Sequence, residues 1–234
     1  MELFNQHTKD FQSGVVIPVN KPLYWTSFDV VKNIRAQLKH QRGIDKIKIG
    51  HAGTLDPKAT GLLLVCTGKA TKQIAGLQEM KKVYVAKIKL GATTPSFDTE
   101  TEENEHFPTD HITRETLENS LKYFTGNIQQ VPPDYSALKS GGKRAYELAR
   151  NGKKTNLKER SVCIESIELT ELHKPYLTIC VTCHKGTYLR ALARDIGIKL
   201  GSGAYLVALT RTQIGDYKLS EAYDQKTIEN ILKN

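Results

Sequence analysis

The amino-acid sequence predicts a mixed α+β protein. Strand-like and helix-like segments interleave along the chain without a regular βαβ rhythm, which argues against a doubly wound parallel sheet. With 234 residues, of which 39% are hydrophobic and 25% charged, the chain is long enough to bury a substantial core. Its longest purely apolar run, LLLVC at 62–66, is far shorter than the roughly 20 residues that span a bilayer.

Short apolar or alternating runs, bounded by glycine, proline or polar residues, predict strands at 14–22, 61–68, 81–91, 161–172, 176–183 and 204–215. Apolar residues at helical spacing predict helices at 27–40, 69–78, 113–125, in the second half of 131–152, at 187–200 and near Leu232. Ser27 is expected to be the N-cap of the first long helix.

Two segments are less regular than the rest. In the strand at 81–91, the positions of Val83, Val85 and Ile88 indicate a slip in register, so the buried face of this strand stays open. The stretch 93–110 is acidic and poorly periodic. It is expected to be an exposed loop or an insertion.

The chain is basic, with a net charge of +9 and a pI near 9.3. A surface of this kind attracts polyanions and binds nucleic acid through phosphate contacts. The alternative is a solvated basic surface with no partner, and charge alone does not separate the two.

The N-terminus, MELFNQHTKDFQ, lacks the basic start and apolar stretch of a signal peptide, so a cytoplasmic location is expected. Cys180 and Cys183 form a CxxC pattern within a strand-like segment. Residues three apart on a strand face opposite sides, so free or buried thiols are expected here rather than a metal or redox site.

The segment GHAGTLDPKATGLL, at 50–63, places one carboxylate in a constrained setting. Its glycines permit close backbone approach or positive φ, and Pro57 fixes its own φ and pushes Asp56 into an extended conformation. An Asp-Pro step also initiates ordinary turns, and composition by itself favours that interpretation. The open question is whether the turn holds a reactive group.

A second segment, KGTYLRALARDIG at 185–197, places Arg190 and Arg194 on one helix face. One interpretation is a surface helix in which Arg194 pairs with Asp195. An arginine nearer the core would need a carboxylate partner, because a buried unpaired charge is costly, and Asp56 is a candidate partner for Arg190.

A third set combines aromatic and basic residues. Tyr84 lies in a strand among lysines, and Tyr135 follows a double proline. The basic residues after it are Lys139, Lys143, Arg144, Lys153 and Lys154. A tyrosine beside cations suits stacking on a nucleobase, although a strand tyrosine more often serves packing. No P-loop, GxGxxG, HExxH or Ser-His-Asp signature is present, which points to chemistry without a nucleotide cofactor or a metal.

Taken together, five segments resemble the TruB family of tRNA pseudouridine synthases: VNKPLYWTSFDVV, GHAGTLDPKATGLL, KKVYVAKIKLGATTPSFDTET, VPPDYSALKSGGKRAYELAR and KGTYLRALARDIG. The resemblance covers about residues 14–217. It implies a pseudouridine-synthase fold, a mixed and mostly antiparallel sheet flanked by helices with a central RNA-binding cleft. It also implies isomerisation of the uridine at position 55 in the TΨC arm of tRNA, with no cofactor.

The resemblance also assigns roles to single residues. The catalytic aspartate of the family falls on Asp56, the tyrosine that stacks on the target base on Tyr84, and the arginine that pairs with the aspartate on Arg190. The family's substrate-binding and supporting positions fall on His51, Tyr188, Leu209, Lys21 and Pro22. Tyr205 and Thr210 depart from the family's GAHLxxLRR pattern.

A polar leader is expected at 1–13, a catalytic domain at 14–220 and a short C-terminal helix at 221–234, without a PUA domain. Many members of the family continue into a C-terminal PUA domain; either this chain binds RNA through its catalytic domain alone, or that module is missing from the sequence. The expected partner is the TΨC stem-loop of tRNA, with no membrane and no obligate protein partner. Two alternatives stay open. One is a guide-RNA-dependent relative, and the other is an RNA-folding helper that needs no catalysis.

Overall fold

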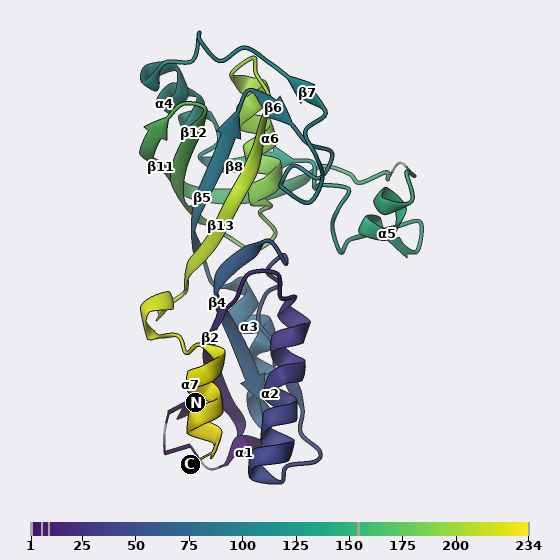
Figure 1. The fold of residues 1–234 in the computed structure, drawn as a ribbon, viewed down its shortest axis with the longest axis vertical. Coiled ribbons are helices and arrows are strands. Elements are labelled where there is room, and N and C mark those ends of the chain that lie inside the picture. The colour runs from purple at the N-terminus through teal and green to yellow at the C-terminus, as the bar shows by residue number, and fades with distance from the viewer. Residues whose placement is uncertain (1, 6, 9, 154, 234) are drawn as a thin grey trace. The chain divides into compact units, whose positions relative to one another are not determined.

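The computed structural model describes residues 2–5, 7–8, 10–153 and 155–233, so Lys154 of the basic set lies outside the described residues. The chain forms two compact units, one of Met1–Tyr84 with Thr210–Asn234 and one of Val85–Leu209. Strands β5 (Lys82–Leu90) and β13 (Ala204–Ile214), both labelled in Figure 1, each have residues in both units. Each unit is described by itself below.

The first unit is a sheet with helices on it. Its strand order is β1-β2-β4-β13, with β3 paired to β4 and β14 paired to β13. The pair β1/β2 is parallel, and β2/β4, β3/β4 and β13/β14 are antiparallel. Besides parts of β5 and β13, the elements are β1 Glu2–Leu3, α1 Phe11–Gly14, β2 Val15–Lys21, α2 Ser27–Arg42, β3 Ile49–His51, β4 Ala59–Thr67, the 3-10 helix η1 Gly68–Gln73, α3 Ile74–Glu79, β14 Tyr217–Lys218, the 3-10 helix η2 Leu219–Glu221 and α7 Gln225–Lys233.

Both faces of this sheet are buried, which explains the continuous apolar run of β4. One face of β2 and β4 packs against α2 and α7, with Leu63 and Val65 in the same cluster as Ile34 and Ile228. The opposite face places Leu62, Leu64 and Cys66 in a second cluster, with Ala70, Leu77 and Ile214. A strand buried on both faces does not alternate between apolar and polar residues.

The second unit contains the strand order β5-β12-β11-β8, in which β11 pairs antiparallel with both β12 and β8. Besides parts of β5 and β13, its elements are β6 Ala92–Thr93, β7 Glu105–His106, α4 Arg114–Tyr123, β8 Gly126–Gln130, β9 Lys139–Ser140, β10 Lys143–Arg144, α5 Ala145–Arg150, β11 Arg160–His173, β12 Tyr176–Cys183 and α6 Leu189–Lys199. The predicted α+β class is confirmed, and each long helix and strand lies where the sequence placed it.

Three local predictions are wrong. The N-cap of α2 is Thr26 and not Ser27, because Thr26 and Asp29 form a reciprocal capping box. β5 has no slip in register, since alternate residues are buried from Lys82 through Tyr84 to Leu90. The error arose because Val83 and Val85 face outward, while the inward positions include a lysine and a tyrosine.

The third correction concerns the acidic stretch 93–110, which is not simply an exposed loop. Thr94, Ser96 and Asp98 are buried, and short strands β6 and β7 pair across it. The carboxylate of Asp98 accepts hydrogen bonds from the Ser96 hydroxyl (2.6 Å) and the Glu100 amide (2.8 Å). The stretch folds around its own polar side chains, which apolar periodicity does not reveal.

No helix among the described residues is long and apolar enough to cross a membrane.

Gly61 provides a test of the β4–β13 contact. Its φ is +102°, and a Cβ there would lie 2.3 Å from the backbone oxygen of Arg211. We expect Gly61→Ala to lower the free energy of unfolding by about 3 kcal/mol, because a backbone clash adds to the strain of positive φ. Gly43→Ala is the matched control, since Gly43 also has positive φ but open space around it; it should cost about 1 kcal/mol. Equal losses for the two variants, measured by urea unfolding, would contradict the close approach.

Candidate active site

Asp56 lies in the loop between β3 and β4, and backbone bonds fix both sides of that loop. The Ala52 amide donates to the Leu64 carbonyl (2.8 Å), and the Ala59 amide donates to the carbonyl of Asp56 itself (3.0 Å). Ser27 of α2 holds the middle of the loop, because its hydroxyl accepts from the Leu55 amide (2.9 Å) and donates to the Leu55 carbonyl (3.2 Å). The loop is therefore joined to the sheet and to the first turn of α2.

Arg211 holds the same loop from β13. Its side chain is 1% exposed, its Nε donates to the Leu62 carbonyl (2.8 Å) and its Nη2 donates to the Gly53 carbonyl (3.1 Å). Beside it, the hydroxyls of Thr60 and Thr210 lie 3.0 Å apart. Because Gly53 and Leu62 stand on the two sides of Asp56, one guanidinium joins both. Arg211 was not singled out from the sequence, where its only signal is a single arginine inside an otherwise strand-like segment.

Lys21, at the end of β2, is a second buried cation, and its charge interacts with that of Asp56. Its ammonium donates to the carbonyls of Pro22 (3.0 Å) and Trp25 (2.6 Å), which fixes the turn before α2. Burial lowers the pKa of Lys21 to about 8, the nearby charge of Asp56 opposes this shift, and the charge of Arg211 adds to it. A lysine in this state is still mostly protonated at neutral pH.

His51 ends β3, just before the loop. Burial and the positive charge of Arg211 lower the pKa of its imidazole. The neutral form is therefore favoured at neutral pH, so His51 can offer one donor and one acceptor to a substrate. In the first unit, Lys21, Pro22, His51 and Asp56 thus lie around one loop.

Tyr24 lies against the loop as well, in the turn between β2 and α2. Its amide donates to the Pro57 carbonyl (2.8 Å), and the Lys58 ammonium lies 5.2 Å from the centroid of its ring. Its φ is +67°, a left-handed conformation that costs a residue with a Cβ about 1–2 kcal/mol.

In the second unit, Arg190 of α6 is buried and surrounded by oxygen atoms. Its Nε lies 3.6 Å from Oδ2 of Asp98, and its Nη2 donates to the Tyr135 carbonyl (2.9 Å). The ion pair is almost fully buried, with both side chains about 5% exposed (5% and 6%). Asp98 was not singled out from the sequence, because it belongs to the acidic stretch that was expected to be exposed. The predicted pair of Arg194 with Asp195 is present at 2.8 Å.

The other predicted site residues are structurally well held. Tyr84 is 9% exposed on the buried face of β5, and Leu209 of β13 is also 9% exposed. Tyr188 is the N-cap residue of α6, and the side chain of the buried Gln130 bonds both its amide (2.9 Å) and its carbonyl (3.2 Å). Asp56 belongs to one unit and Arg190 to the other, so their pairing stays a prediction.

Residues 39–189 match the TruB family pseudouridylate synthase (N terminal domain). Curated relatives are similar along nearly their whole length. The tRNA pseudouridine synthase B of Parabacteroides distasonis is 53% identical over 96% of this chain and 95% of that protein. The protein of the same name from Flavobacterium johnsoniae is 45% identical over 96% of this chain and 99% of that protein.

The chain belongs to the TruB family. It is an isomerase of the pseudouridine synthase type. Its fold is similar to that of one chain in the crystal structure of a Cbf5-Nop10-Gar1 complex, with a TM-score of 0.71, 29% identity, and coverage of 94% of this chain and 54% of that chain. A structure of an H/ACA RNP bound to a substrate RNA containing 2'-deoxyuridine gives a TM-score of 0.68 at 27% identity, covering 94% of this chain and 53% of that one. The chain thus spans about half the length of the chains it matches in these structures.

The thiols of this TruB family member are not grouped into a site. All four cysteines are free, and Cys183 is buried while Cys180 lies on the other face of β12, as the alternation predicted. Burial raises the pKa of Cys66 to about 11, which leaves it as an unreactive thiol. Among the described residues, no group of three or more His, Cys, Asp and Glu side chains could hold a metal ion.

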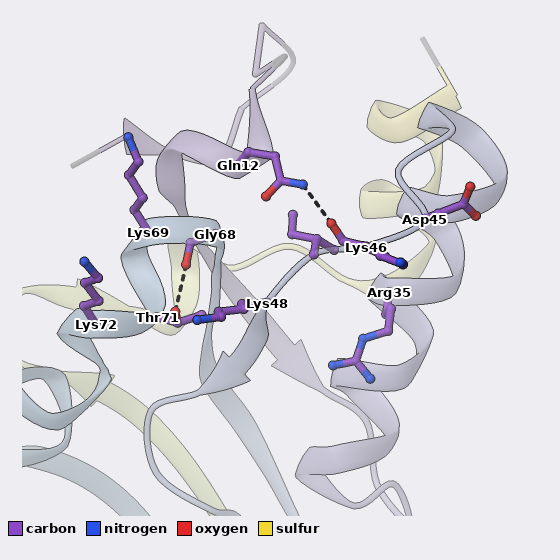
Figure 2. A pocket seen from close by; sticks show the side chains of 10 residues that line it. Gln12, Arg35, Asp45, Lys46, Lys48, Gly68, Lys69, Thr71 and Lys72 are labelled. Carbon is purple, nitrogen blue, oxygen red and sulfur yellow. Dashed lines mark hydrogen bonds between the residues drawn. The ribbon is translucent and has the colours of Figure 1, made fainter.

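A basic pocket of about 780 Å³ lies in the first unit (Figure 2). Gly68, which lines the pocket, directly follows the last residue of β4, so the pocket lies at the end of β4 away from Asp56. Its cationic lining residues are Arg35, Lys46, Lys48, Lys69 and Lys72. One acidic residue, Asp45, also lines it, and Asp45 lies 3.2 Å from Lys39. Gln12 donates to the Lys46 carbonyl (2.8 Å) and so ties α1 to the wall of the pocket. Eight steps of about 3.3 Å along β4 separate its two ends by roughly 26 Å.

The electrostatic interaction between Lys21 and Asp56 can be measured. Because the charge of Asp56 raises the pKa of Lys21, we expect Asp56→Asn to lower that pKa from its value of about 8. The matched control is Asp29→Asn, since Asp29 acts in the same direction but more weakly and asparagine keeps a capping side chain. NMR titration of the Lys21 side chain measures both shifts. An equal or larger shift in Asp29→Asn would show that Asp56 is not the main partner.

Proposed function

We propose that this chain converts uridine to pseudouridine at position 55 in the TΨC arm of tRNA, with Asp56 as the nucleophile. The observation that carries the proposal is the Asp56 loop itself. The guanidinium of Arg211 and the hydroxyl of Ser27 hold this loop by hydrogen bonds, and the charge of the buried Lys21 acts on Asp56, within a member of the TruB family. Preorganisation of this kind places a reacting group without a cost at the moment of reaction. A cytoplasmic location, where tRNA is processed, follows from this function.

The reaction moves one bond and exchanges one proton. The N1–C1′ bond of the uridine breaks, the uracil turns, and a C5–C1′ bond forms; C5 loses its proton and N1 gains one, so that no atom is lost. The ionised carboxylate of Asp56 attacks at one of two atoms. At C1′ of the sugar it displaces N1 and is itself displaced when C5 bonds to C1′; at C6 of the base it adds to the C5=C6 bond and is eliminated after the C5–C1′ bond has formed. The ammonium of Lys21 interacts with this carboxylate and favours its charged form, because their electrostatic interaction is mutual.

The remaining predicted residues act on the substrate. The target base must leave its stack to be reached, and stacking on Tyr84 offsets part of that cost. Arg190, held by Asp98, pairs with Asp56 and orients it. His51, Tyr188 and Leu209 contact the RNA or the uracil, which closure around the base keeps from diffusing away.

The basic pocket supports RNA as the substrate. In the part of the chain that the structure describes, none of its five lining cations forms an ion pair, so they remain available to phosphate groups. A pocket roughly 26 Å along β4 from the catalytic loop suits a folded RNA that presents a loop nucleotide and a distant backbone segment together. We infer that the pocket binds the phosphate backbone of tRNA outside the target loop.

Asp56→Asn tests the nucleophile. We expect the variant to form no pseudouridine on an unmodified TΨC stem-loop, because an amide cannot replace an ionised carboxylate, while its RNA affinity stays within about threefold of wild type. Mass-resolved mapping of pseudouridine and filter binding measure the two quantities. Full activity in this variant would refute the assignment.

The wild-type control in the same assay separates the two alternatives. Pseudouridine on bare tRNA, without guide RNA or protein partner, excludes dependence on a guide RNA. An RNA-folding role would appear as faster tRNA refolding that persists in Asp56→Asn.

Neutralising lysines that line the pocket should weaken tRNA binding without changing the rate of isomerisation. We expect Lys48→Gln with Lys69→Gln to reduce tRNA affinity and to lower the salt slope by about 1 for each phosphate that is no longer bound, with the single-turnover rate at saturation unchanged. Lys226→Gln is the matched control, an exposed lysine of the same unit that does not line the pocket. An unchanged slope in the double variant would exclude the pocket from the RNA interface.

A further inference from the structure

Tyr24 is a part of the catalytic surface that the reaction described above does not use. Its amide bonds the carbonyl of Pro57, the residue after Asp56, and its ring lies against the ammonium of Lys58, the next residue along. All of these residues belong to the first unit. Tyr24 and the catalytic loop therefore form one connected segment of surface.

The conformation of Tyr24 is costly, and its ring makes little use of the core. The side chain is 68% exposed although the backbone is held at φ +67°, where glycine or asparagine would fit with less strain. The carbonyls on either side of it, Pro22 and Trp25, are fixed by the buried ammonium of Lys21. Strain that the surroundings impose on an exposed aromatic residue, beside a catalytic loop, indicates a use for the ring.

The chemistry around the ring indicates an RNA base. One aromatic face with a lysine beside it is the combination that binds unpaired nucleotides, because the ring stacks on the base and the cation meets the phosphate. The same combination recurs in the first turn of α2, where Phe28 is 53% exposed and the Lys32 ammonium lies 5.0 Å from its ring centroid. Cations so close to both rings disfavour an apolar protein partner.

We propose that Tyr24 and Lys58 form a stacking site for an unpaired base of the RNA next to the target uridine. The ring of Tyr24 receives the base, and Lys58 meets its phosphate. The identity of the RNA rests on the proposed function, but the stacking site is a separate claim. It makes Tyr24 a substrate-binding residue and leaves the chemistry at Asp56 unchanged.

Three variants in the Asp56→Asn background test the site without turnover. Tyr24→Gly removes the ring and relieves the backbone, so its melting temperature should not fall. Its affinity for the TΨC stem-loop should fall about 5- to 150-fold, which is the loss expected for one base stack. Tyr24→Phe keeps the ring and should bind within about twofold of the parent.

The control for a general effect of exposed rings is Tyr123→Ala. Tyr123 is 66% exposed and has the Lys199 ammonium 4.1 Å from its ring centroid, but it ends α4, a helix to which no RNA contact is assigned. Its removal should leave affinity unchanged. A 2-aminopurine base placed beside the target uridine adds a direct readout, since its quenching on binding should be lost in Tyr24→Gly and kept in Tyr123→Ala.

The proposal is overturned if Tyr24→Gly binds RNA as tightly as the parent, if Tyr24→Phe loses as much affinity as Tyr24→Gly, or if Tyr123→Ala loses as much. These results are distinguishable from failure of the proposed function. If the proposed function were wrong, the wild-type protein would form no pseudouridine on tRNA at all, whatever residue stands at position 24.

Discussion

The guanidinium of Arg211 is the constraint on which the catalytic loop depends. It bonds one carbonyl before Asp56 and one after it, and Gly61 allows the backbone of β13 to come close enough for both contacts. A loop joined at both sides to one buried cation cannot shift one side without breaking a buried charge-assisted hydrogen bond. The position of Asp56 is therefore a property of the sheet in the first unit, and only secondarily of its own turn residues.

Much of this fold could be predicted because its signals are local. Helical stripes, alternating strands and proline breaks lie in contiguous sequence, and the double-sided burial of β4 is visible as LLLVC. The errors arose where a polar residue has a structural role. Lys82 occupies an inward position of β5 because its ammonium bonds the carbonyls of Gln78 and Met80, so a hydrophobic pattern misjudges that strand.

In the candidate site, too, local features could be predicted from the sequence and long-range contacts could not. The constrained backbone around Asp56 could be predicted from the sequence, since Pro57 restricts Asp56 and the nearby glycines permit a tight turn. The roles of Arg211 and Asp98 could not be predicted, because the sequence alone does not distinguish a buried charged residue from an exposed one. What distinguishes them is the partner: a carbonyl at 2.8 Å for Arg211, and a guanidinium at 3.6 Å for Asp98. Such partners lie far along the chain, and only the fold brings them together.

The catalytic loop also carries a cost to stability. The pKa of Lys21 is about 8 in the folded protein and 10.5 for an unperturbed lysine, so between these values the unfolded chain binds more protons and stability rises with pH. Below pH 8 the folded protein retains the buried ammonium and the penalty of its desolvation. Neutral pH is thus where this residue stabilises the fold least and where its charge acts on the Asp56 carboxylate. The left-handed Tyr24 adds a second cost beside the same loop. Lys21 and Tyr24 thus both lower the stability of the fold, and both lie near the Asp56 loop. This is expected where positioning a reactive group takes precedence over local stability.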